Sequence, residues 1–132
     1  MLDEQIYRES LLDAFKNPQN RGRISKPDLE AKMVSPLCGD EVSLQIKLED
    51  GRVEKAVFSG NGCAISQASA SLLAESIVRK ELPEIDKLKM GDILKLIGIN
   101  PTPARLGCAL LSLGVLKKAL IEYRLLKKIS SS

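Results

Sequence analysis

Residues 41–58 read EVSLQIKLEDGRVEKAVF, and this stretch decides the fold. In its first half, apolar residues alternate with polar ones, which is the period of a strand that buries one face. The dipeptide Asp50-Gly51 follows and is a strong signal for a two-residue hairpin turn. The apolar residues that come next continue as the return strand: Val53, Ala56, Val57 and Phe58. The stretch therefore predicts an antiparallel hairpin with one apolar face to cover.

The segments around this hairpin complete the prediction. Residues 29–34 alternate in the same way and predict a further strand, so the three strands form a meander. Helical periodicity marks the remaining segments, namely residues 4–16, 64–80, Pro83 to about Lys89, Asp92–Ile97 and Ala104 to about Lys128. The fold class expected is α+β, a three-stranded antiparallel sheet with helices packed on one face. Only four residues are aromatic, so the core must be aliphatic.

Length and charge bound the class of protein. The 132 residues are enough for one domain with a real core, so residues 1–132 are expected to form a single domain. Residues 117–132 hold five basic side chains against one acidic one, which is more than the whole net charge of +3. We interpret this basic C-terminal helix end as a solvated face, with a docking surface for an acidic partner as the alternative. A nucleic-acid partner is not expected, because such a protein needs a wider basic face with stacking groups.

Cysteine and histidine content restricts the chemistry. Apolar runs fall short of the roughly 18 residues of a membrane span, and the N-terminus lacks the apolar region of a signal peptide. Neither membrane attachment nor secretion is expected. Three cysteines in such a chain indicate reduced thiols and a cytoplasmic location. The chain has no histidine, so any metal must be held by sulfur and oxygen.

Cys63 lies in the segment GNGCAISQASAS, residues 60–71. Gly60 and Gly62 permit positive φ and close backbone approach. The residues after Cys63 turn to a helical period, which places its thiol at or just before a helix N-terminus. Unpaired N–H groups and the positive end of the helix dipole favour a thiolate there, the form that binds metal or carries sulfur. The alternative is a small buried hydrophobic residue.

The other two cysteines also fall at breaks between predicted elements. Cys38 precedes the second strand and Cys63 follows the third, so antiparallel pairing puts both at one end of the sheet. Cys108 can join them if its helix packs with its N-terminus at that end. Asp40 offers a fourth donor, unless it only caps its own turn. Three thiolates and one carboxylate suit zinc or an iron–sulfur cluster, and the harder carboxylate makes such a site exchange its metal more readily than four cysteines would.

Three segments carry a resemblance to a known family: PLCGD at 36–40, GNGCAISQASAS at 60–71 and PARLGCA at 103–109. They resemble the signature segments of the IscU/NifU N-terminal family of iron–sulfur cluster assembly scaffolds, in the same order and with similar spacing. The opening segment, from Tyr7 through Gly22, is similar as well. The resemblance covers about residues 5–122 and implies a SufE/IscU-like fold.

The resemblance implies a scaffold rather than an enzyme. Such a scaffold accepts persulfide sulfur from a cysteine desulfurase and combines it with iron into a transient 2Fe–2S cluster. The residues implied as cluster and metal ligands are Cys38, Asp40, Cys63 and Cys108. The cluster then passes to apo iron–sulfur proteins. Family members can also hold zinc in this site.

Two departures from the pattern of the IscU branch point to an alternative function. Gly107 stands where the IscU branch has a histidine, and residues 102–106, TPARL, replace the LPPVK segment read by a dedicated Hsp70-type chaperone. The resemblance therefore does not support that chaperone as a partner. The approach to Cys108 is more like the SufU branch, which implies a zinc-dependent sulfurtransferase, a persulfide acceptor that activates a desulfurase. The 45-residue separation of Cys63 from Cys108 is nevertheless close to the IscU length.

Individual roles follow as hypotheses. Cys108 is the first candidate for persulfide acceptor, because Arg105 and the helix N-terminus give it positive surroundings, and Cys38 is the second. Arg105 would act as an auxiliary that steadies the thiolate or pairs with Asp40, or it is an ordinary solvent-exposed residue. A purely structural zinc, whose loss unfolds the domain, is a further alternative. A homo-oligomer with a cluster shared between chains is also left open.

Overall fold

The computed structural model of the protein describes residues 9, 12–16, 20–35, 39–98 and 101–130. Within them, a short helical stretch at 12–16 precedes a sheet, and helices follow the sheet. The labelled elements are β1 Leu29–Val34, β2 Glu41–Glu49, β3 Arg52–Asn61, α2 Ala64–Ile77, α3 Leu82–Asp86, α4 Met90–Ile97 and α5 Pro103–Ser130. Most of the helix expected at residues 4–16 lies outside the described residues.

The sheet is the predicted antiparallel meander, with strand order β1-β2-β3. Leu29 pairs with Ile46 in one ladder, and Leu44 pairs with Phe58 in the other. Asp50 and Gly51 make the turn between β2 and β3 with φ of 53° and 77°. These angles match the type I′ turn that the dipeptide Asp-Gly favours. The α+β fold class is confirmed.

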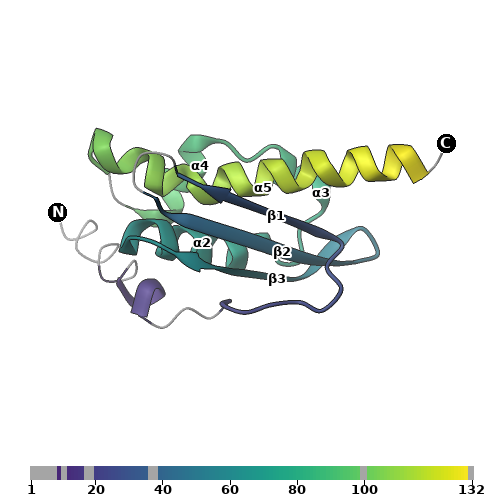
Figure 1. Ribbon diagram of the computed structural model, residues 1–132, viewed down its shortest axis with the longest axis horizontal. Helices are drawn as coiled ribbons and strands as arrows, with labels where there is room; N and C mark the ends of the chain where they lie inside the picture. The colour runs from purple at the N-terminus through teal and green to yellow at the C-terminus, as the bar shows by residue number, and fades with distance from the viewer. Residues whose placement is uncertain (1–8, 10–11, 17–19, 36–38, 99–100, 131–132) are drawn as a thin grey trace.

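One face of the sheet carries the core. Figure 1 shows β1, β2 and β3 in front and α2, α4 and α5 behind them, so the helices gather on one side. Inward side chains of the strands pack against α2 and α5, and Phe58 is the sole aromatic residue among the buried core residues described. The remaining members are mostly aliphatic, as the composition predicts: Val42, Leu44, Ile46, Leu73, Ile77, Val115, Leu116 and Leu120.

The third strand is longer than the sequence predicts. The apolar residues predict the return strand only as far as Phe58, but Gly60 and Asn61 pair with Val42 and Glu41 and extend β3 to Asn61. The reason is a close approach: a Cβ on Gly60 would lie 2.1 Å from the Glu41 carbonyl oxygen, and its φ is +140°. Glycine is needed at this position, but inside the ladder rather than in a loop.

The helix after the sheet is shorter than predicted. It ends at Ile77 instead of residue 80, and Arg79 adopts a φ of 74°. The Arg79 N–H donates to the Val53 carbonyl oxygen at 2.7 Å, and the Val53 N–H donates to the Lys80 carbonyl oxygen at 3.0 Å. Main-chain pairing of residues 79 and 80 with the start of β3 therefore ends the helix at this point.

The later helices agree with the sequence to within a few residues. Pro83 lies in the first turn of α3, which ends at Asp86 rather than near Lys89. Helix α4 begins at Met90 rather than Asp92, and Gly98 caps it with a left-handed φ of 71°. Helix α5 begins at Pro103.

The outer edge of β3 is covered by the chain that precedes β1. Phe58 exchanges two main-chain hydrogen bonds with this segment, its N–H donating to Asn20 and its carbonyl accepting from Gly22. The Arg21 guanidinium lies over the Phe58 ring, 5.8 Å from its centroid, and donates to the Gly60 carbonyl oxygen at 2.7 Å. The segment runs along that edge in Figure 1.

The C-terminal half of α5 extends past the sheet (Figure 1). Arg124 forms a 3.0 Å ion pair with Asp86, and Lys117 bonds the Asp86 carbonyl oxygen. These contacts fasten α5 to α3. Large apolar side chains beyond Leu120 are exposed, namely Ile121, Leu125 and Leu126. Within the described residues, no helix combines the length and the apolar content that crossing a membrane would need.

Candidate metal centre

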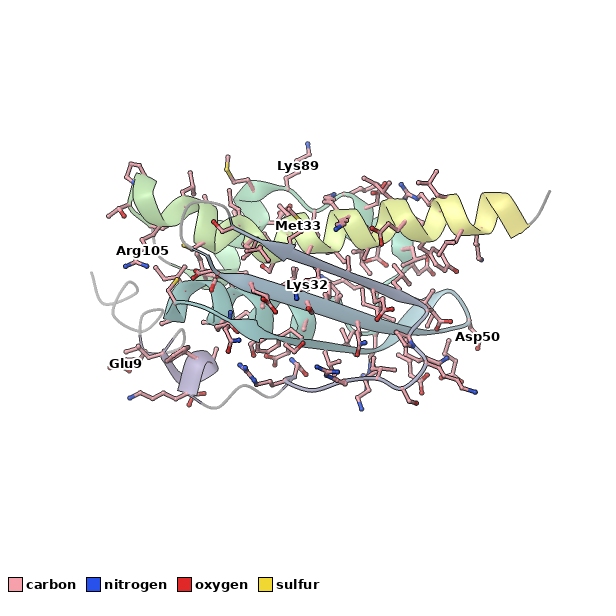
Figure 2. The ribbon with its side chains drawn as sticks, in the orientation of Figure 1. Glu9, Lys32, Met33, Asp50, Lys89 and Arg105 are labelled. Atoms are coloured by element: carbon pink, nitrogen blue, oxygen red, sulfur yellow. The ribbon has the colours of Figure 1, made fainter. Side chains whose placement is uncertain are left out.

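Four element ends meet at one end of the sheet. The pairing of Glu41 with Asn61 places the start of β2 beside the end of β3. Cys63 lies two residues after the end of β3 and is the N-cap of α2. Helix α5 packs on α2, and its first turns lie at this same end. Figure 2 shows Arg105 of α5 at this end of the molecule and Asp50 of the hairpin turn at the other.

Three potential ligands converge here. The ligand atoms of Asp40, Cys63 and Cys108 all lie within 4.8 Å of one another. Asp40 and Cys108 are buried, and Cys63 is half-buried. Donors on one tetrahedral zinc lie roughly 3.3–3.8 Å apart, since Zn–S is about 2.3 Å and Zn–O about 2.0 Å. A contraction of about 1 Å would therefore bring these donors to bonding geometry.

Cys38 lies outside the described residues. The sequence prediction that it completes the donor set therefore stays a prediction. Asp40, two residues later, is the first described ligand candidate on that side of the site. Its main-chain carbonyl oxygen accepts a 2.7 Å hydrogen bond from the Ser35 N–H, which ties the start of β2 to the end of β1.

A glycine gives the carboxylate its room. A Cβ on Gly62 would lie 2.7 Å from Asp40 Cγ and 2.7 Å from Ser66 Oγ. Real Cβ atoms do not approach that closely, so only glycine allows the Asp40 side chain to lie against the start of α2. Of the two uses of glycine considered for this position, Gly62 does not have a positive φ, whereas Gly60 does. What this position requires is the close approach.

The start of α2 leaves the Cys63 thiol available. Cys63 adopts an extended N-cap conformation without a side-chain capping bond, and the first turn has no acidic residue. Its carbonyl oxygen accepts two bonds instead, from Ser66 Oγ at 3.1 Å and from the Gln67 N–H at 3.2 Å. The thiol therefore makes no side-chain capping bond, and it belongs to the N-cap of a helix whose unpaired N–H groups and dipole favour a nearby anion.

Cys108 lies in the second turn of α5. The Arg105 and Leu106 N–H groups both donate to the Thr102 carbonyl oxygen, which fixes how this helix begins. Arg105 is exposed, and its proposed pairing with Asp40 stays a prediction. A Cβ on Gly107 would meet nothing within 4 Å, so the missing histidine leaves open space rather than a filled contact.

Sequence reasoning missed the polar residues that hold these segments together. Ser66 and Gln67 are both buried and bond the Cys63 carbonyl oxygen. Arg21 holds the Gly60 carbonyl oxygen from the opposite side of β3. A serine in the first turn of a helix commonly donates its hydroxyl to the carbonyl oxygen three or four residues earlier, and that tendency could have identified Ser66.

The donor set suits a soft or borderline metal. Two thiols and one carboxylate in a partly buried site match zinc or iron chemistry and do not match the all-oxygen sites of calcium or magnesium. The Asp40 carboxylate is the hardest of the three donors, so its bond to a soft or borderline metal is the one expected to break most readily. The residues present therefore fit a metal or cluster that is held and then given up.

Comparison with known proteins identifies the family. The model of the NifU-like N terminal domain matches residues 6–130. The chain is 34% identical to the zinc-dependent sulfurtransferase SufU of Bacillus subtilis, over 90% of this chain and 92% of that protein. It is 36% identical to the iron–sulfur cluster assembly scaffold protein IscU of Thermotoga maritima, over 98% of this chain and 99% of that one. Both functions considered for the sequence, the scaffold and the sulfurtransferase, are thus represented among its relatives.

Solved structures of NifU-like and SufU-type proteins have the same fold as this chain. The N-terminal NifU-like protein of Brucella abortus superposes with a TM-score of 0.73 at 25% identity, covering 93% of this chain and 96% of that chain. A putative SUF-system scaffold protein, FiSufU from Fervidobacterium islandicum, gives a TM-score of 0.74 at 27% identity, covering 89% and 98%. The expected resemblance is confirmed, and the chain belongs to the family of NifU-like N-terminal domains.

Proposed function

We propose that this protein is a scaffold on which a 2Fe–2S cluster is assembled and from which it is transferred. The single observation that carries the proposal is the convergence of Asp40, Cys63 and Cys108 within 4.8 Å. Cys38 is the proposed fourth ligand. The cargo is iron and sulfide, and the protein acts by holding them rather than by turning over a substrate as an enzyme does.

Sulfur delivery follows from thiol chemistry. A thiolate of this chain attacks the outer sulfur of a persulfide on a cysteine desulfurase, whose own thiolate leaves as the S–S bond breaks. Cys108 is the proposed acceptor, with Cys38 as the second candidate and Arg105 as an auxiliary. Reduction of that sulfur to sulfide needs an external thiol or electron-donor protein. Apo iron–sulfur proteins are the proposed recipients.

Thiols with these roles require a reducing compartment, which supports a cytoplasmic location. Residues 1–132 are proposed to act as one domain, because the sheet and its helices share a continuous core.

The second candidate function is a zinc-dependent sulfurtransferase that activates a desulfurase. The open position at Gly107 favours it, because one ligand option of the scaffold branch is missing there. Under this alternative zinc occupies the proposed four-residue site, and sulfur is the only cargo.

The test is metal and sulfide analysis with an absorption spectrum, after anaerobic incubation with a desulfurase, cysteine, ferrous iron and a thiol reductant. Stoichiometric iron and sulfide with visible bands, lost in Cys108→Ser, support the scaffold. Zinc that iron does not displace, together with faster desulfurase turnover, supports the sulfurtransferase instead.

A further inference from the structure

Gln67 touches both main-chain segments that carry the described donors. It is 4% exposed, and its amide nitrogen donates to the Glu41 carbonyl oxygen at 3.4 Å and to Ser66 Oγ at 3.3 Å. Glu41 directly follows Asp40. On the other side, the Gln67 N–H and Ser66 Oγ both bond the Cys63 carbonyl oxygen. Gln67 therefore spans from the start of β2 to the start of α2.

The orientation of this amide is fixed by its partners. The Ser66 hydroxyl gives its one hydrogen to the Cys63 carbonyl, so its oxygen can only accept from Gln67. The Glu41 carbonyl oxygen also only accepts. Both neighbours demand the N–H side of the amide, and the reversed orientation would set oxygen against oxygen.

This orientation leaves the other end of the amide unsatisfied. Gln67 Oε1 is buried and, among the described residues, has no hydrogen-bond partner. A buried acceptor without a partner costs stability. In the metal-free protein, methionine or leucine at position 67 would remove that cost but would also leave the Glu41 carbonyl oxygen without its Gln67 donor.

We propose that Gln67 is a positioning residue whose side chain sets the separation of Asp40 from Cys63, through its bond to the Glu41 carbonyl oxygen and through Ser66 Oγ, which in turn bonds the Cys63 carbonyl oxygen. This inference rests on the proposed function, since it assigns Gln67 a role toward the metal or cluster held there. Residues that hydrogen-bond directly to metal-ligating side chains typically change metal affinity by about 10–100-fold when removed. Gln67 acts through neighbouring groups instead, so a loss of about tenfold is expected.

The test compares Gln67→Met and Gln67→Leu with a matched control, Ser69→Ala. Ser69 is also in α2, is fully buried, and its hydroxyl likewise has no partner among the described residues. Anaerobic titration with Co²⁺ gives the dissociation constant and, from thiolate-to-cobalt bands, the coordination. Each titration is run where circular dichroism shows the variant fully folded, and the melting temperature of the metal-free form is measured separately.

The expected result is a loss of Co²⁺ affinity of about tenfold in both Gln67 variants, with altered cobalt bands, in protein that remains fully folded without metal. Ser69→Ala should bind Co²⁺ as wild type does. Unchanged affinity and bands in the Gln67 variants would overturn the positioning role while leaving the proposed function intact. Failure of the wild-type protein to bind Co²⁺ through thiolates would instead overturn the proposed function, and the positioning role with it.

Discussion

At the scale of single residues, the site depends on a residue without a side chain as much as on the residues that offer ligands. Asp40 reaches the other donors only because residue 62 has no side chain. The sequence shows a glycine there, but glycine has several uses, and a flexible turn is the commonest. The contact with Asp40 becomes visible only when the start of β2 is placed against the start of α2.

Gly62→Ala should therefore weaken metal binding without disturbing the core. The new Cβ would meet Asp40 Cγ at 2.7 Å, so the carboxylate must move away from the thiols. We expect zinc affinity, measured by chelator competition, to fall by about tenfold or more. Gly91→Ala is the control, because a Cβ there meets nothing within 4 Å. Equal affinity in the two variants would contradict the role given to Gly62.

At the scale of elements, the long helix α5 must be fastened beyond the sheet, and polar contacts to α3 do this. The side-chain hydrogen bond from Arg124 is the main cause that lowers the pKa of Asp86; desolvation opposes it, and the positive charges of Arg124 and Lys117 lower the pKa further. A carboxyl whose pKa is lowered by folding stabilises the folded state at neutral pH. That contribution disappears as the pH falls through the lowered pKa.

Asp86→Asn should accordingly lower the melting temperature slightly at pH 7, and the difference from wild type should shrink toward zero in acid. The effect is small because both side chains are largely exposed. It should also shrink at about 1 M salt, where the screening length is about 3 Å. The Lys117 bond survives in this variant because it uses the Asp86 main chain. A difference that stays constant with pH would argue against the ion pair as its source.

At the scale of the whole molecule, the main core cluster is built without the candidate ligands, although Cys108 is itself buried. The main cluster of buried apolar residues lies between the sheet and the helices and contains none of the candidate ligands.

Removing the metal should then leave a folded protein. Melting followed by circular dichroism, with chelator and with zinc, should show cooperative unfolding in both. A zinc concentration of 100 times the dissociation constant should add about 2.7 kcal/mol of stability. Loss of helical signal on chelation alone would indicate a purely structural zinc.

Much of this architecture could be predicted from the sequence. The alternation over residues 41–58 and the Asp50-Gly51 turn fix the hairpin, and the antiparallel geometry already brings the Asp40 and Cys63 segments to one end. The junctions after β3 and after α2 could not be predicted. They depend on pairing partners distant in sequence, such as Arg79 with Val53. Gln67 was missed for the same reason, because its partner Glu41 lies 26 residues away.

The covering of β3 by Asn20–Gly22 has a consequence for association between molecules. An open sheet edge is a template onto which a strand of another chain can add, and such growth leads to aggregation. Here one edge is occupied by the chain itself. At the other edge, β1 carries charged side chains, and Lys118 bonds the Lys32 carbonyl oxygen. The protein can therefore offer its half-buried Cys63 thiol to other proteins at the end of its sheet while its edges stay closed to unspecific strand pairing.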